Sequence, residues 1–377
     1  MEKSNQIRYY PALDLLRFIG AAIILIYHYH HFYFYKVYFG PTNGYPTWEN
    51  SRQPFYEFLT SFYHSGYWAV QFFWLLSGFV FAFVYLKRKV SAKEFFILRF
   101  SRLYPLHFLS LIVITALQYS SLGLLGSFQL IEINDLYHFI LNLFYAQYWG
   151  FQEGYSFNSV SWSISLEELV YWGFWIAAIK LKVKSFSGIA FITIIAFLLN
   201  PLFSIYSDAF FFFFGGATIY LIHSKITTFQ NIFIMIGCVF STILFLFIIN
   251  NIPELTNLLS IEILPKFQPF FIKIYYFLFF SSLVFLFAYI DKQNLLTVRQ
   301  QNFCRKAGSL TYSTYMLHLP IQILILIVFD YFNISRDLFD LNIVFLFYFI
   351  FMLYIGRISF THFERPIQKY IRKRFEK

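Results

Sequence analysis

Long apolar segments recur along this chain of 377 residues. Several exceed the ~18 consecutive apolar residues that identify a membrane-spanning helix. The sequence is 59% hydrophobic and only 13% charged, whereas a soluble domain carries about 25% charge. Ten-residue segments of alternating hydrophobicity, which are typical of outer-membrane barrels, are absent from the sequence. The sequence therefore predicts an all-α, polytopic membrane protein.

Ten apolar segments are predicted to cross the membrane around a polar central cavity. They are residues 10–35, 64–86, 104–122, 160–179, 187–205, 208–222, 231–249, 269–290, 310–329 and 341–360. Residues 138–149 are apolar but too short to cross, which predicts a re-entrant or interfacial segment. Of the 29 Lys and Arg residues, 22 lie in the proposed inner segments and five in the outer loops. This bias predicts that both termini are cytoplasmic and explains the net charge of +10 without a nucleic-acid partner.

The first predicted span contains Asp14, Arg17 and His28. Ionisable groups are costly in hydrocarbon and usually face a protein interior or a water-filled cavity. Eleven helical steps bring Arg17 and His28 to one face, about 16 Å apart along the axis. Asp14 lies one turn before Arg17, where an ion pair lowers the cost of both charges. His28 could be a general base or nucleophile; the alternative is a packing or interfacial histidine beside His30 and His31.

Two further groups of charged residues could carry chemistry. Arg99 and Arg102 are three residues apart beside a predicted span, and two guanidinium groups suit the phosphates of a nucleotide-like ligand. Ordinary positive-inside charge is the alternative. Glu167 and Glu168 lie in an apolar segment, where a carboxylate could orient the His28 imidazole or polarise a hydroxyl. Interfacial charge is the alternative there.

The ninth predicted span begins with hydroxylated residues and includes Tyr312 and His318. Such residues often pack helices together, so packing and catalysis both remain open for this segment. The two cysteines, Cys238 and Cys304, form no disulfide framework and no metal-binding spacing. No metal is therefore predicted.

Six short segments, in this order and spacing, resemble the acyltransferase 3 family of integral membrane acyltransferases. They are LDLLRF with YHYHHF (13–32), LLSGFVF (75–81), RFSR (99–102), SWSISLEELVYW (161–172), GSLTYSTYMLH (308–318) and FERP (363–366). The RFSR segment is similar to the family's Arg-x-x-Arg motif. The fourth segment looks like its Trp-Ser-Leu-Ser-x-Glu-x-x-x-Tyr signature, which places the family glutamate on Glu167. Thr311 stands where Ser is common in the fifth segment.

The resemblance implies an O-acyltransferase that moves an acyl group, usually acetyl from acetyl-CoA, to a hydroxyl of an extracytoplasmic glycan or lipid-linked saccharide. It implies that His28, Arg17 and Glu167 are catalytic and that Arg99 and Arg102 bind the CoA phosphates. The substrate would contact a further set of four residues, and Asp14 would be structural. Those four are Trp162, Ser163, Tyr312 and His318.

The expected organisation is an acyltransferase domain over residues 1–363 and a basic cytoplasmic tail over residues 364–377, in the stand-alone form without a fused SGNH domain. The expected location is a bacterial inner membrane. An exporter without group transfer could use the polar helix face that carries Arg17 and His28 as a substrate path. A non-catalytic membrane assembly protein is a third alternative. The sequence leaves open the acceptor, the acyl group, and whether His28 is a base or an acyl carrier.

Overall fold

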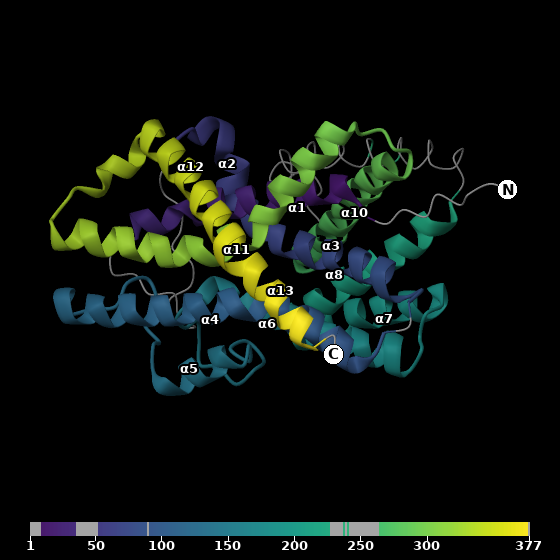
Figure 1. Ribbon diagram of the computed structural model, residues 1–377. Coiled ribbons are helices and arrows are strands. Elements are labelled where there is room, and N and C mark those ends of the chain that lie inside the picture. Colours follow the sequence, from purple (N-terminus) through teal and green to yellow (C-terminus); the bar gives the residue numbers. More distant parts are fainter. Residues whose placement is uncertain are drawn as a thin grey trace. The chain divides into compact units, whose positions relative to one another are not determined.

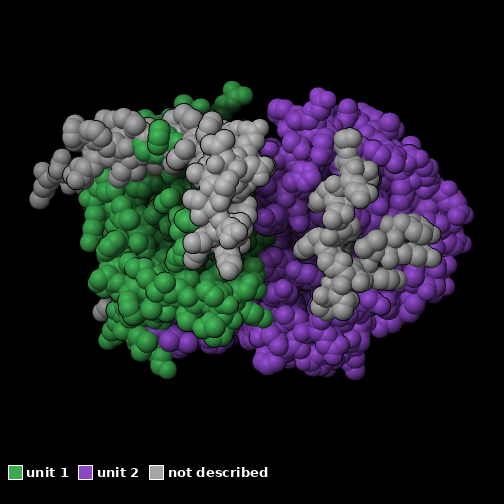
Figure 2. Space-filling view, turned by 180° about the vertical axis from the view of Figure 1, so that it is seen from behind, with its two compact units in different colours: residues 1–17, 70–88, 177–306 green, residues 18–69, 89–176, 307–377 purple. Residues whose placement is uncertain are grey.

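The computed structural model describes residues 9–34, 52–88, 90–226, 237, 240 and 264–375, and the regular elements among them are all helices. The predicted all-α polytopic fold is therefore confirmed. The helices belong to two compact units, each discontinuous in the sequence (Figure 2). Unit 1 contains residues 1–17, 70–88 and 177–306, and unit 2 contains residues 18–69, 89–176 and 307–377.

Unit 1 is built around aromatic side chains and a capped helix end. Its main helices are the start of α1 (Pro11–Tyr27), most of α3 (Ala69–Tyr85), α7 (Phe186–Leu198), α8 (Asn200–Lys225) and α10 (Leu264–Lys292). Three successive Phe side chains of α8, residues 212–214, are fully buried. Both carboxylate oxygens of Asp291 accept the backbone N–H of Ala12, at 2.9 and 3.1 Å. This bond satisfies a donor that the first turn of α1 leaves open.

Helices α3 and α8 cross at two glycines. A Cβ atom on Gly78 would lie 1.7 Å from the carbonyl oxygen of Phe213. A Cβ atom on Gly216 would lie 1.8 Å from the carbonyl oxygen of Leu75. Small residues allow helix backbones to approach this closely in membrane proteins. The LLSGFVF segment therefore supplies one half of the contact between these two helices.

A largely buried ion pair joins α8 and α10 within unit 1. Nζ of Lys273 lies 2.6 Å from Oδ1 of Asp208 and donates to Oδ1 of Asn200 at 2.7 Å. Asn200 also donates to Asp208, at 2.7 Å. Lys273, which the charge count assigns to the outer loops, therefore lies inside a helix and is paired there, as a charge among apolar side chains must be.

Unit 2 contains three long helices and several short elements. They are η1 (His28–Tyr33), α2 (Tyr56–Ser65), α4 (Ala92–Leu125), α5 (Leu136–Leu143), α6 (Trp162–Phe174), most of α11 (Val298–Tyr331), η5 (Arg336–Asp340), α12 (Asn342–Ser359) and α13 (Arg365–Phe375). With 8 residues, α5 is too short to cross a membrane. Its length agrees with the expectation that residues 138–149 do not cross, and a re-entrant or interfacial position stays a prediction.

Helix α4 begins much earlier than the sequence predicts. Ser91 caps it by accepting the backbone N–H of Glu94 at 3.1 Å, and these two residues form the Ser-x-x-Glu pattern of a capping box. The helix runs for 34 residues, about 51 Å, which exceeds the ~30 Å hydrocarbon core. The second predicted span ends at residue 86 and the third begins at residue 104, which left a predicted loop between them. That loop is wrong over most of its length, because the cap carries the helix through RFSR.

The C-terminal basic segment is also helical. Helix α13 follows α12 through a π-helical turn, η6 (Phe360–Glu364), and the three form one continuous ribbon (Figure 1). It packs against α4, and Nε of Arg372 donates to Oγ of Ser101 at 3.2 Å. The residues predicted as a basic tail therefore form a helix docked beside the RFSR motif.

Seven helical segments among the described residues are long and apolar enough to cross a membrane. They are Pro11–Tyr33, Tyr56–Tyr85, Ala92–Leu125, Asn200–Lys225, Phe270–Lys292, Val298–Tyr331 and Asn342–Phe375. The fourth predicted span is divided between α6 and a π-helix, η4 (Trp175–Lys180). The fifth corresponds to the shorter α7, and the seventh lies outside the described residues except for residues 237 and 240. The predicted count of ten is therefore not reproduced in the described part of the chain.

The charge bias predicts the orientation of the chain in the membrane. In a background with Cys238 and Cys304 replaced by Ser, a cysteine at Glu57 should react with an impermeant thiol reagent in intact cells. Cysteines at Lys93 and Phe375 should react only after permeabilisation. Labelling of Lys93→Cys or Phe375→Cys in intact cells would reverse the orientation.

Candidate active site

The turn that carries His28 is a 3-10 helix at the end of α1. The α-helix ends at Tyr27, and residues 28–33 continue as η1, a tightening that is frequent at helix C-termini. Aromatic residues and histidines are weak helix formers, which favours the change within HYHHFY. The first predicted span therefore changes helix type at His28, and the four residues that follow it are buried.

The short helix η5 holds η1 in place within unit 2. The hydroxyls of Tyr29 and Tyr33 both donate to the carbonyl oxygen of Phe339, each at 3.0 Å. The rings of Phe32 and Phe339 stack with their centroids 4.2 Å apart. These contacts fix the orientation of the turn from which His28 projects.

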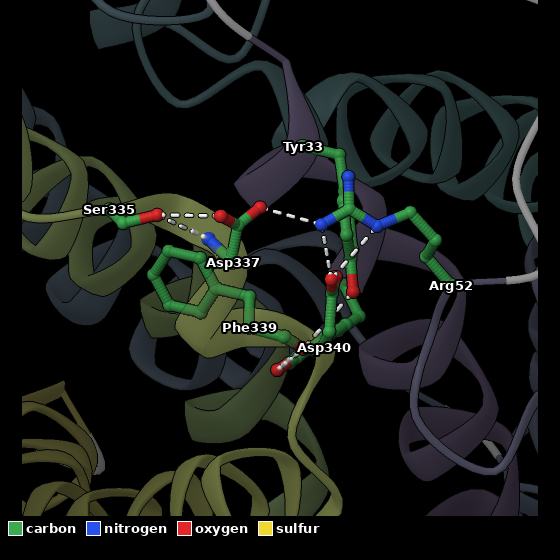
Figure 3. Close-up of polar contacts among 7 residues, drawn as sticks. Tyr33, Arg52, Ser335, Asp337, Phe339 and Asp340 are labelled. Atoms are coloured by element: carbon green, nitrogen blue, oxygen red, sulfur yellow. Dashed lines mark hydrogen bonds and ion pairs between the residues drawn. The ribbon is translucent and has the colours of Figure 1, made fainter.

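Arg52 binds η5 at the exposed rim of unit 2 (Figure 3). Its guanidinium donates to Asp337 at 2.6 Å through Nη2 and to Asp340 at 2.9 Å through Nε. The hydrogen bond from Arg52 holds the pKa of Asp337 below its ordinary value. The stability gained is present while Asp337 is ionised and is lost as the pH falls through this lowered pKa. It is small because the groups are exposed.

His28 forms a hydrogen-bonded pair with His318 of α11. Nδ1 of His28 lies 3.0 Å from Nε2 of His318, and the two ring planes are 18° apart. The two rings are therefore nearly parallel, with their centroids 4.9 Å apart. Nδ1 of His318 in turn lies 2.6 Å from the carbonyl oxygen of Tyr315. Two residues 290 positions apart in the sequence thus form one polar unit.

Gln322 connects this pair to the rest of η1. Its Nε2 donates to the carbonyl oxygen of His28 at 2.8 Å, and its Oε1 lies 2.8 Å from Nδ1 of His31. His318 and Gln322 are four residues apart on α11, so they lie on one helix face. One face of α11 therefore holds both the side chain and the backbone of His28.

The histidines of the cluster differ in exposure. His30, His31 and His318 are at most 4% exposed, whereas His28 is partly exposed. A base or nucleophile must be reached by its substrate, so exposure favours His28 among these four imidazoles. This is consistent with the predicted role of His28.

Ser163 of α6 approaches the cluster through Tyr315. Its Oγ lies 2.6 Å from the Tyr315 hydroxyl, and that hydroxyl donates to the carbonyl oxygen of Val160 at 2.7 Å. Because the carbonyl of Tyr315 also binds His318, Ser163 and the histidine pair share one intermediate residue. Trp162 is half-buried, with its ring centroid 5.3 Å from that of Tyr148. Substrate contacts of Trp162 and Ser163 stay predictions.

A second group of polar side chains lies around the RFSR motif. The Arg99 guanidinium lies over the ring of Tyr171, 5.8 Å from its centroid, and the Tyr171 hydroxyl donates to Glu167 at 2.5 Å. His28 bonds His318 and Gln322, and Glu167 is not among its hydrogen-bond partners in the described part of the chain. The role of Glu167 toward His28 therefore stays a prediction.

Tyr312 also belongs to the group around RFSR. Its hydroxyl donates to the carbonyl oxygen of Leu103, next to Arg102, and lies 3.2 Å from the Tyr145 hydroxyl. Six residues, about 9 Å of helix, separate Tyr312 from His318 on α11. The two sets of predicted site residues are therefore close along one helix.

The acyltransferase domain of the acyltransferase 3 family matches residues 10–358. This covers nearly the whole chain and all but the last of the six similar segments. The chain belongs to the acyltransferase 3 family. No curated protein and no solved structure matches it. Membership of this acyltransferase family identifies a membrane acyltransferase that uses an acyl donor and an acceptor.

Two predicted site residues of this acyltransferase lie in unit 1. Nη1 of Arg17 bonds Oδ1 of Asp14 at 2.7 Å, so the predicted ion pair is present. Asp14 is buried, which fits a structural role. Arg17 and His28 belong to different units, and a shared action of the two side chains stays a prediction.

Several residues around the site were not predicted. Tyr315 and Gln322 bond directly to the histidine pair, and Arg372 bonds the RFSR segment. The spacing of Gln322 from His318 could have indicated the first contact, because an isolated amide four residues from a histidine shares its helix face. Across the described residues, no group of three or more His, Cys, Asp or Glu side chains is arranged to hold a metal ion.

Proposed function

We propose that this acyltransferase transfers an acetyl group from acetyl-CoA to a hydroxyl of an extracytoplasmic glycan or lipid-linked saccharide. The observation that carries the proposal is the partly exposed His28 imidazole, hydrogen-bonded through Nδ1 to the buried His318. An imidazole held through one nitrogen can use the other, Nε2, on a substrate. The enzyme is proposed to reside in a bacterial inner membrane with both termini in the cytoplasm.

In the proposed reaction Nε2 of His28 takes the proton of the acceptor hydroxyl. The hydroxyl oxygen forms a bond to the thioester carbonyl carbon, and the carbon–sulfur bond of acetyl-CoA breaks. The proton then passes from His28 to the departing CoA thiolate, so one ester and one free thiol are formed. If His28 instead carries the acetyl group, its Nε2 attacks the thioester first, the carbon–sulfur bond breaks and CoA leaves as the thiolate. The hydroxyl oxygen then attacks the acetyl-imidazole, the carbon–nitrogen bond breaks, and the hydroxyl proton neutralises the thiolate. Both routes use the same nitrogen.

The CoA phosphates are proposed to bind Arg99 and Arg102. Guanidinium groups are suited to phosphate because they offer several donors in a fixed plane. The short span of α11 between Tyr312 and His318 supports a path by which the pantetheine arm carries the thioester from the RFSR motif to His28. Arg17 would stabilise developing negative charge near the thioester. Glu167, Trp162, Ser163 and Tyr312 would help to bind or orient the substrates.

Removing either guanidinium should weaken CoA binding more than it slows chemistry. Each of Arg99→Ala and Arg102→Ala should lose about 1.5–3 kcal/mol of binding per lost charged hydrogen bond, or roughly 10–100-fold in Kd. The KM for acetyl-CoA should rise with little change in kcat, because phosphate contacts are similar in the ground and transition states. Isothermal titration with CoA and steady-state kinetics measure both quantities.

Lys93→Ala provides the matched control, because Lys93 is an exposed cation on the same helix, two turns before RFSR. Its CoA affinity should stay near that of the wild type. Equal losses in all three variants would indicate general surface charge instead of a phosphate site.

A further inference from the structure

We propose that His318 is a positioning residue that holds His28 in the tautomer with hydrogen on Nδ1, which leaves the lone pair of Nε2 free to act. This inference rests on the proposed function and adds a role for His318 other than the predicted substrate contact. It follows from the direction of each hydrogen bond along the series Tyr315, His318 and His28.

The direction is set by the carbonyl of Tyr315. A carbonyl oxygen can only accept, so Nδ1 of His318, 2.6 Å away, must carry a hydrogen. In a neutral imidazole the other nitrogen then has none, and Nε2 of His318 is an acceptor. The atom 3.0 Å from it, Nδ1 of His28, must therefore be the donor. This assigns the hydrogen of neutral His28 to Nδ1.

The surroundings of His318 preserve this arrangement. Its side chain is fully buried in α11, and a buried imidazole favours the neutral form because burial penalises charge. The other titratable rings facing His28 are His30 and His31 of η1 and Tyr27 of α1, with ring centroids 5.9, 4.9 and 5.0 Å from that of His28. Nδ1 of His28 has its hydrogen-bond contact with Nε2 of His318. His318 is thus the group that selects the tautomer.

His318 also supports His28 during the reaction. When Nε2 of His28 accepts the hydroxyl proton, the ring becomes positively charged and its Nδ1–H becomes a stronger donor. Nε2 of His318 already lies 3.0 Å from this nitrogen and can accept the stronger bond. Gln322 holds the backbone of His28 in place by donating to its carbonyl oxygen. The arrangement parallels the general need of a catalytic histidine for a partner that fixes its tautomer.

Three substitutions of His318 separate positioning from packing. His318→Gln can place its amide oxygen near the position of Nε2, so it keeps an acceptor for His28. His318→Asn is shorter, so it keeps a donor toward the Tyr315 carbonyl and loses the acceptor for His28. His318→Leu loses both the donor and the acceptor. We expect kcat to fall about 10–100-fold in the Leu and Asn variants. In the Gln variant kcat should stay within a few-fold of the wild type, and the KM for acetyl-CoA should change little in all three.

Nitrogen-15 spectra of ring-labelled histidine report which ring nitrogen carries the hydrogen. A residue that only packs against His28 would not change that position. In the wild type, His28, assigned by its loss in His28→Ala, should show a protonated Nδ1 and an unprotonated Nε2. In His318→Leu the hydrogen should shift toward Nε2, and in His318→Gln it should stay on Nδ1. Protonation of Nε2 in the wild type, or equal losses of kcat in the Gln and Leu variants with unchanged melting temperatures, would overturn the proposal.

The outcomes also distinguish this inference from the proposed function. Wild-type transfer that is abolished in His28→Ala but unaffected in His318→Leu would overturn the positioning role alone. A folded wild type that transfers no acetyl group would overturn the proposed function, and the nitrogen-15 spectra would still decide the tautomer.

Discussion

Replacing His28 with alanine should lower kcat for acyl transfer by at least about 10²–10⁴-fold, the usual loss when a general acid–base group is removed. The KM for acetyl-CoA should change little, because the CoA phosphates are proposed to bind at Arg99 and Arg102 instead. His28 is partly exposed, and its backbone carbonyl keeps its bond from Gln322. The variant should therefore still fold. Kinetics and thermal unfolding of the detergent-purified protein measure both effects.

His64→Ala is the matched control for this variant. His64 lies on the surface of unit 2 in α2, where its Nε2 is 3.1 Å from the Tyr56 hydroxyl. Its loss should leave kcat near the wild-type value. Near-normal turnover in His28→Ala, together with an inactive His30→Ala or His31→Ala, would assign the chemistry to a different imidazole. Recovery of His28→Ala by added imidazole would support a direct chemical role.

Replacing either glycine at the crossing of α3 and α8 should destabilise the protein strongly. An added methyl group at Gly78 or Gly216 would lie under 2 Å from a backbone carbonyl oxygen of the other helix. The backbone cannot turn aside as a flexible side chain can, so the two helices must separate. Overpacking typically costs about 1–3 kcal/mol and occasionally more, and we expect Gly78→Ala and Gly216→Ala to reach the upper part of this range. Size-exclusion chromatography and thermal unfolding in detergent measure the loss of folded protein.

Gly123→Ala tests whether the effect comes from the close approach of two helices. Gly123 lies in α4, and a Cβ atom there would meet no other atom within 4 Å. Alanine is a better helix former than glycine by about 0.5–1 kcal/mol, so this variant should be as stable as the wild type or slightly more stable. Equal stability of Gly78→Ala and the wild type would contradict the close contact between α3 and α8.

The fold class could be predicted from the sequence because it depends on the total number and length of apolar segments. Many apolar segments with little charge are compatible only with membrane helices, whichever residues end them. The residues at which the helices begin and end were harder to predict from the sequence. The run of basic residues between the second and third predicted spans predicted a loop around RFSR, yet the Ser91–Glu94 capping box begins α4 before it. A local hydrogen bond of this kind overrides composition within one or two turns.

The candidate site was predicted residue by residue but not as an arrangement. His28 and His318 both stood out as ionisable groups in apolar segments. Their hydrogen bond depends on how η1 and α11 meet, which the sequence leaves open. The same holds for the contact of Glu167 with Tyr171, whose ring lies under the Arg99 guanidinium. Spacing within one helix could be predicted, and pairing between helices required the structure.

The central claim is that this family member moves an acetyl group from acetyl-CoA to a hydroxyl by means of His28. The most direct measurement incubates the purified protein with acetyl-labelled acetyl-CoA and a panel of glycans, and follows free CoA thiol and labelled glycan together. The wild type should release one CoA for each alkali-labile acetyl ester formed, and His28→Ala should form neither product above background. A folded wild type that neither binds CoA nor consumes acetyl-CoA would contradict the account and favour an exporter.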